Sequence, residues 1–137
     1  YVPGGRATVP GTLPFIGNIL TADPVRYARI VAVMDAEPAV AIGSPTVAWA
    51  DAAFRAMAQL AEPGYASRIR QPILIVAAGR DKIVSTPAIE EFSGHLRAGT
   101  HLIIAGALHE VMMEQDQFRQ QFWAAFDAFV PGTPLFG

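Results

Sequence analysis

The sequence predicts an α/β fold, with a βαβα unit of a mostly parallel sheet in the second half of the chain. Two apolar runs, ILIVAA at 73–78 and THLIIA at 100–105, have the length and β-branched content of strands that are buried on both faces. Each run is followed by a segment whose apolar side chains recur at helical spacing. Strands that alternate with helices in this way are typical of parallel sheets with right-handed crossovers.

Composition and charge limit the class of protein. The chain has 137 residues, of which 52% are hydrophobic and 16% are charged, so it is long and apolar enough to bury a core as one folded domain. Its net charge of −2 gives no reason to expect nucleic acid as a partner. It contains no cysteine, which excludes disulfides and thiolate zinc sites but assigns no compartment.

Residues 1–70 are predicted to be an irregular arm followed by helical segments of a cap. The first 14 residues contain three prolines and three glycines, which disfavour regular structure. The chain also opens on Tyr1 rather than Met, so we expect a processed, truncated or cleaved product. Asp23 and Pro24 suit the N-cap and first turn of a helix that ends at or near Pro38.

A second helix is expected in the alanine-rich stretch that follows, until the sequence Glu-Pro-Gly stops it. Ser44 is the expected N-cap, and Pro45 suits the first turn. Both helices carry small side chains, so close packing between them is expected. Trp49, Phe54 and Met57 are interpreted as packing residues rather than as participants in chemistry.

Residues 71–137 are predicted to form the βαβα part of the fold. After the first strand, residues 85–87 read Ser-Thr-Pro and suit a helix start, and this helix is expected to end at Gly99. The last helix is expected over about 114–130, with a stripe of phenylalanines on one face and Pro131 just beyond its end.

Two chemically capable side chains follow the two predicted strands, each by a few residues: Asp81 after the first and His109 after the second. The carboxyl ends of neighbouring parallel strands meet at one edge of a sheet, where ligands and catalytic groups collect. A carboxylate beside an imidazole fixes the tautomer of the ring and stabilises the imidazolium that forms on proton abstraction. The sequence therefore predicts a catalytic pair, Asp81 and His109.

These two segments resemble a known family. PILIVAAGRDKIVSTPAIEEF resembles the acid-bearing strand and turn of α/β-hydrolases, and LIIAGALHEVMMEQDQFRQQFWAAFDAFV resembles their last strand, histidine loop and C-terminal helix. The His-Glu sequence followed by Glu114 resembles the lysophospholipase and monoacylglycerol-lipase branch, which is serine aminopeptidase-like.

The resemblance implies specific roles. Asp81 would be the acid of the triad, and His109 would be its general base. Residues 15–66 would be the later part of a helical cap that shapes an apolar substrate pocket, and no cofactor would be required.

The resemblance covers only the second half of the family's fold. No G-x-S-x-G nucleophile elbow occurs, and Ser44 is followed by a proline, which lacks the N–H that an oxyanion hole would need. We therefore expect the nucleophile and the first half of the sheet outside this chain, in a missing N-terminal half of the same protein or on a second chain. An isolated half-sheet exposes an apolar edge, so we expect pairing with that half or dimerisation with a copy.

The sequence gives no pattern for a metal or a nucleotide. His109, Glu110 and Glu114 form His-Glu-x-x-x-Glu, which is not the His-Glu-x-x-His zinc pattern, and Gly-x-Gly-x-x-Gly is absent. Glu114 is expected instead to favour the N-terminus of the last helix. His95 and His101 are interpreted as surface or structural residues.

The leading hypothesis is a serine hydrolase that cleaves a lipid-like or small carboxylic ester, with this chain inactive when alone. A second hypothesis keeps the fold and changes the bond that is broken, as in peptidases, dehalogenases and C–C hydrolases. A third treats the chain as a non-catalytic interaction fragment. The identity of the nucleophile separates the first two hypotheses. Failure of a fluorophosphonate to label the full protein would favour the third.

Overall fold

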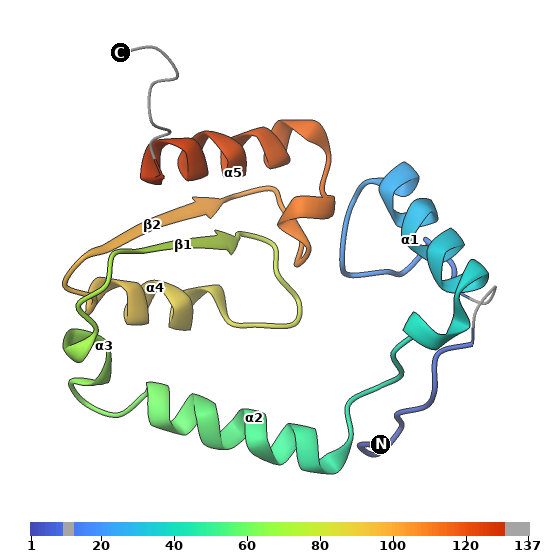
Figure 1. The fold of residues 1–137 in the computed structure, drawn as a ribbon, viewed down its shortest axis with the longest axis horizontal. Helices are drawn as coiled ribbons and strands as arrows, with labels where there is room; N and C mark the ends of the chain where they lie inside the picture. Colours follow the sequence, from blue (N-terminus) through green and yellow to red (C-terminus); the bar gives the residue numbers. More distant parts are fainter. Residues whose placement is uncertain (10–12, 131–137) are drawn as a thin grey trace.

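The computed structural model describes residues 1–9 and 13–130. Figure 1 shows a small strand-and-helix unit in the second half of the chain and a helical first half that curves around one side of it. In chain order, with η for 3₁₀ helices, the elements are α1 (Pro24–Ala36), η1 (Pro38–Val40), α2 (Val47–Leu60), α3 (Tyr65–Arg68), β1 (Ile73–Ala78), α4 (Thr86–Gly94), β2 (Gly99–Ile104), η2 (Val111–Met113) and α5 (Asp116–Phe129).

The two strands form the predicted parallel pair. The register runs from Ile73 opposite Gly99 to Ala78 opposite Ile104, so both strands end at the same edge. Helix α4 connects them and lies on one side of the pair, and α5 lies on the other side (Figure 1). The βαβα unit expected from the alternating pattern is confirmed, because each helix covers one face of the strands.

The core lies between the strands and α5. Its fully packed members are Ala78, Ile104 and Ala107, against which half-buried side chains pack, namely Val76, Leu102, Val111, Phe118 and Phe122. The expectation that β1 is buried on both faces holds only at its end, because Ala77 and Ala78 are buried whereas the four preceding residues are partly exposed. Within the described residues, β1 pairs with β2 only, so its other edge lacks a strand neighbour.

Several helix boundaries differ from those expected. Helix α4 ends at Gly94, and Gly99 instead begins β2. Thr46 caps α2 through a hydrogen bond from the N–H of Trp49, whereas the hydroxyl of Ser44 accepts the N–H of Arg6 at 3.1 Å. Ser44 therefore joins the N-terminal arm to the segment before α2 and does not cap the helix. Helix α5 begins two residues later than expected, and the Pro131 that was expected to follow its end lies outside the described residues.

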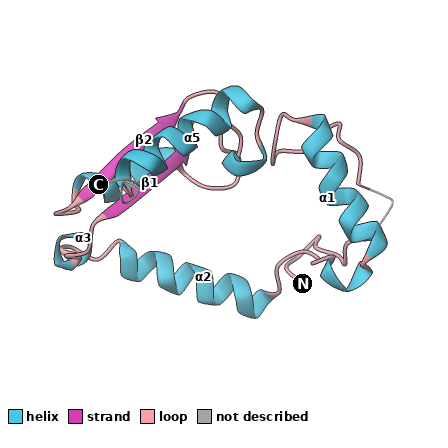
Figure 2. Ribbon diagram, turned by 45° about the horizontal axis from the view of Figure 1, so that its top comes forward, coloured by secondary structure: helices cyan, strands magenta, loops and turns pink. Residues whose placement is uncertain are grey.

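The alanine-rich helices α1 and α2 do not pack together, and that expectation is wrong. They lie end to end around the outside of the fold in both views (Figures 1 and 2). Trp49, Phe54 and Met57, interpreted from the sequence as packing residues, are 62%, 68% and 50% exposed. Helical spacing of apolar side chains indicates an apolar face on α2, but it does not specify which element, if any, covers that face.

Among the described residues, no helix combines the length and hydropathy needed to cross a membrane.

Candidate active site

The loops that follow β1 and β2 are joined by backbone hydrogen bonds. The N–H of Gly79 donates to the carbonyl of Ile104 at 2.9 Å, and the N–H of Arg80 donates to the carbonyl of Ala107 at 2.9 Å. These bonds continue the strand pairing past the ends of the strands. They bring the two loops together at the carboxyl edge, where the sequence predicted them to meet.

Gly79 allows this close approach. A Cβ at this position would lie 2.6 Å from the Cα of Ala105 and 2.7 Å from its carbonyl oxygen. Both neighbours are backbone atoms, which cannot rotate away as a flexible side chain would. A side chain at residue 79 would therefore separate the loop that carries Asp81 from the loop that carries His109.

We expect Gly79→Ala to lower the free energy of unfolding by about 1–3 kcal/mol, the usual cost of overpacking. Gly94→Ala is the matched control, because nothing lies within 4 Å of a Cβ added at the last residue of α4. That control should be neutral or slightly stabilising, since alanine favours a helix more than glycine does. Urea unfolding measures both, and equal midpoints would contradict the packing argument.

Three hydrogen bonds hold the carboxylate of Asp81, and its side chain is almost inaccessible to solvent. Its side chain is 4% exposed, and Oδ2 lies 2.8 Å from Nδ1 of His109. Oδ1 accepts the N–H groups of Ile83 at 2.7 Å and Val84 at 3.1 Å. Burial opposes ionisation, but the hydrogen bonds from Ile83, His109 and Val84 outweigh it and hold the pKa of Asp81 below its ordinary value of 3.8.

The ionised carboxylate determines the orientation and tautomer of His109. An ionised carboxylate can only accept hydrogen bonds, so Nδ1 of His109 is the donor in its 2.8 Å bond to Asp81. In the neutral ring, this leaves the lone pair on Nε2 as the basic site. The His109 side chain is 30% exposed, so its outer edge is accessible to a reacting group. The geometry is that of a general base oriented by a carboxylate.

All four serine hydroxyls are hydrogen-bonded to backbone groups. Ser67 and Ser93 donate to the carbonyls of Gly64 and Ile89 at 3.0 and 2.6 Å, respectively. Ser85 accepts the N–H of Ala88 as the N-cap of α4, and Ser44 holds the N-terminal arm as described above. Among the described interactions, none of these hydroxyls is in hydrogen-bond contact with His109.

The other two histidines lie away from this pair. Nδ1 of His95 is 2.8 Å from the carbonyl of Glu91 at the end of α4, and His101 is exposed on β2. This placement agrees with their interpretation as surface or structural residues.

Glu114 has a contact that sequence reasoning missed. It was expected to favour the start of the last helix, and one oxygen does accept the N–H of Gln115 at 3.1 Å, just ahead of α5. The side chain is nevertheless fully buried, and its other oxygen accepts the N–H of Leu108, the residue before His109, at 2.8 Å. The sequence carried no local signal for this burial, since Met112 in the preceding run VMM is itself 38% exposed.

The described residues contain no cluster of three or more His, Cys, Asp or Glu side chains that could hold a metal ion.

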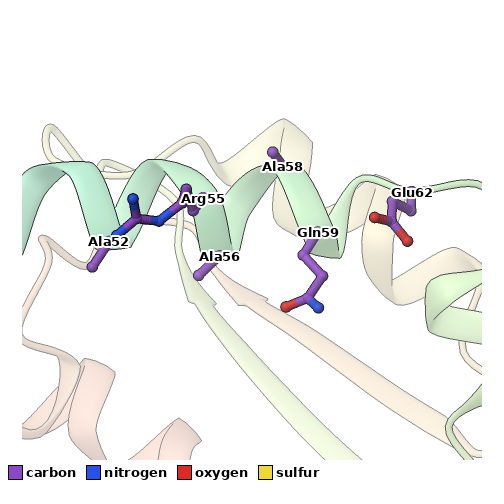
Figure 3. A pocket seen from close by; sticks show the side chains of 6 residues that line it. All are labelled: Ala52, Arg55, Ala56, Ala58, Gln59 and Glu62. Carbon is purple, nitrogen blue, oxygen red and sulfur yellow. The ribbon is translucent and has the colours of Figure 1, made fainter.

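Among the described residues, two hollows lie away from Asp81 and His109. One runs along α2 and is lined by Ala52, Arg55, Ala56, Ala58, Gln59 and Glu62 (Figure 3). The other is apolar and lies between β1 and α5, lined by Leu74, Val76, Phe122, Phe126, Phe129 and Val130. Neither Asp81 nor His109 lines either hollow.

The parallel strands, the crossover helix and the acid–histidine pair at the carboxyl edge define part of an α/β-hydrolase fold. The solved structure of a soluble variant of monoglyceride lipase from Saccharomyces cerevisiae, in complex with a substrate analog, matches with a TM-score of 0.64. The match covers 82% of this chain and 40% of that one at 18% identity, so it bears on the fold alone.

This chain belongs to the serine aminopeptidase S33 family, whose model matches residues 6–116. Lysophospholipase L2 of Escherichia coli strain K12 is 30% identical over 114 residues, which are 78% of this chain and 33% of that protein. A protein of Haemophilus influenzae named probable lysophospholipase L2 is 28% identical over 130 residues, which are 95% of this chain and 40% of that protein. The chain thus spans between a third and two fifths of the length of these relatives.

Proposed function

We propose that this chain supplies the acid and the general base of a serine hydrolase, with Asp81 and His109 in those roles and the nucleophilic serine outside residues 1–137. The observation that supports the proposal is the 2.8 Å hydrogen bond between the carboxylate of Asp81, whose side chain is almost inaccessible to solvent, and the partly accessible imidazole of His109. The hydrogen bonds that tie all four serine hydroxyls to backbone groups also support a nucleophile elsewhere.

The proposed chemistry follows from an ionised Asp81 and a His109 that is protonated on Nδ1. Nε2 of His109 takes the proton of the serine hydroxyl as its oxygen attacks the substrate carbonyl. Asp81 stabilises the imidazolium and keeps Nδ1 protonated. The imidazolium then protonates the leaving group as the carbonyl–leaving-group bond breaks, which yields an acyl-enzyme and the free alcohol. Water attacks the acyl-enzyme by the same route, and the acid and free serine are released.

The substrate that we propose is a monoacyl lipid or a similar small carboxylic ester. The names of the relatives in Escherichia coli and Haemophilus influenzae refer to lysophospholipids, and that of the structural neighbour refers to a monoglyceride. Residues 15–66 would contribute to the cap over the substrate. The nucleophile would come from a preceding N-terminal half of the same protein or from a second chain, so residues 1–137 alone would turn over little or no substrate.

A peptidase is the second candidate, because the family carries the description serine aminopeptidase. The same pair would serve amide hydrolysis, with the imidazolium protonating an amine in place of an alcohol. The acid–histidine pair therefore does not distinguish esters from amides, and the substrate class depends on the residues that bind the substrate.

The test uses the full-length protein that contains these residues. A fluorophosphonate should label one serine, and mass spectrometry should place that serine outside residues 1–137. Comparing kcat/KM for a monoacylglycerol, a lysophospholipid and an aminoacyl p-nitroanilide then separates the ester and amide candidates. Absence of labelling, or labelling of Ser44, Ser67, Ser85 or Ser93, would contradict the proposal and favour a non-catalytic fragment or a nucleophile other than serine.

A further inference from the structure

A short segment before α1 lies against the loop that carries His109. The carbonyl of Leu20 accepts the N–H of Glu110 at 2.8 Å, and the hydroxyl of Thr21 donates to the carbonyl of Met113 at 2.7 Å. Thr21 is 2% exposed, so this contact is buried although its partners are 92 positions apart in the sequence. We call residues 20–22 the docking segment. It joins the start of the cap region to the histidine loop.

Glu114 lies where the docking segment, the histidine loop and α5 meet. Its side chain is fully buried, and Oε1 accepts two N–H groups, from Leu108 at 2.8 Å and from Ala22 at 3.2 Å. Oε2 accepts the N–H of Gln115 at 3.1 Å. A single carboxyl group thus satisfies backbone donors from three separate parts of the site.

These contacts restrain the backbone that carries the imidazole. Leu108 directly precedes His109, and its N–H donates in a part-buried bond, where loss of the acceptor is disfavoured. A shift of Leu108 would break its bond to Glu114, so the hydrogen bond favours one backbone position for His109. The 2.8 Å contact between His109 and Asp81 depends on that position.

We propose that Glu114 is a positioning residue for His109. Through Ala22, it also makes the geometry of the acid–histidine pair depend on the docking segment that leads into α1. The inference rests on the proposed function, because it concerns the same site. Glu114 acts through the backbone of Leu108 and takes no part in proton transfer.

The experiment compares Glu114→Met with Glu114→Gln in the full-length protein. Methionine has a similar length and no strong acceptor, whereas the carbonyl oxygen of glutamine can still accept from Leu108 and Ala22. Glu110→Met is the matched control, because Glu110 is in the same loop with an exposed side chain. Kinetics with a monoacylglycerol are measured below the thermal unfolding midpoint of every variant.

We expect Glu114→Met to lower kcat by about 100-fold, the cost of a small misplacement of a catalytic group, with little change in KM. Glu114→Gln should retain most of the native kcat, and Glu110→Met should retain all of it. A merely structural role for Glu114 would lower the unfolding midpoint but leave the kcat of the folded enzyme unchanged, and that result would overturn the inference.

A spectroscopic measurement is independent of turnover. In protein labelled with ¹⁵N-histidine, the Nδ1 proton of His109 that is bonded to Asp81 should be visible by NMR. It should persist in Glu114→Gln and disappear in Glu114→Met, because the loosened ring exposes this proton to exchange with water. An unchanged Nδ1 signal in Glu114→Met would overturn the positioning role.

Two further outcomes keep the proposals separate. If His109→Ala abolishes turnover while Glu114→Met has native kcat, the inference fails and the proposed function stands. If His109→Ala is fully active, the proposed function fails, and the NMR signal still decides whether Glu114 holds the ring.

A second variant is available should Glu114→Met not fold. Glu114→Asp withdraws the carboxyl from Leu108 by one methylene. It should lower kcat at constant KM, and native kcat there would overturn the inference.

Discussion

Replacing His109 by alanine in the full-length protein should lower kcat for ester hydrolysis by on the order of 10⁶-fold, the loss typical of removing the base of a serine triad. Without the imidazole, nothing accepts the proton of the attacking serine or returns it to the leaving group. KM should change little, because the ring contributes mainly to the transition state. Initial rates with a monoacylglycerol and the rate of fluorophosphonate labelling should fall together.

His95→Ala and His101→Ala are the matched controls. Both side chains are exposed and away from Asp81, so each variant should keep native kcat and KM. The assignment of His109 as general base would be wrong if its alanine variant hydrolysed ester at the native rate. It would also be wrong if one of the two controls lost as much activity as His109→Ala.

Replacing Asp81 by asparagine should lower kcat by on the order of 10⁴-fold while the fold is kept. The amide oxygen can still accept the N–H groups of Ile83 and Val84, as Oδ1 of Asp81 does. The amide nitrogen then faces Nδ1 of His109, which must become an acceptor. The proton moves to Nε2, so the ring can no longer take a proton from the serine. The kcat of Asp81→Asn should stay low at every acidic and neutral pH.

The same variant has a predictable effect on stability as pH is lowered. The folded-state pKa of Asp81 is held below 3.8, so ionised Asp81 stabilises the fold above that pH. This contribution is lost as pH falls from 3.8 through the folded-state pKa. The difference in thermal unfolding midpoint between the native protein and Asp81→Asn should therefore narrow below pH 3.8. A constant difference down to pH 2 would argue against a stabilised carboxylate.

The sequence was most informative where local chemistry and periodicity act together. Asp23 caps α1 and Ser85 caps α4, as their positions before a proline-containing first turn indicated. The apolar runs identified β1 and β2 within one residue, and their parallel pairing follows from the helix between them. In contrast, Thr46 rather than Ser44 caps α2, because Ser44 is engaged by the N-terminal arm. That competing partner is 38 positions away, so no local rule could have identified it.

By itself, the sequence determined the βαβα order and the edge of the sheet where Asp81 and His109 would lie, because strand and helix periods are local properties. Only the tertiary structure decided that Gly79 permits the two loops to touch and that the buried carboxyl of Glu114 binds the loop of His109 to residues 20–22. It also decided that the apolar face of α2 is exposed. These features depend on which distant backbone atoms come within bonding distance, and residue spacing along the chain does not encode that distance.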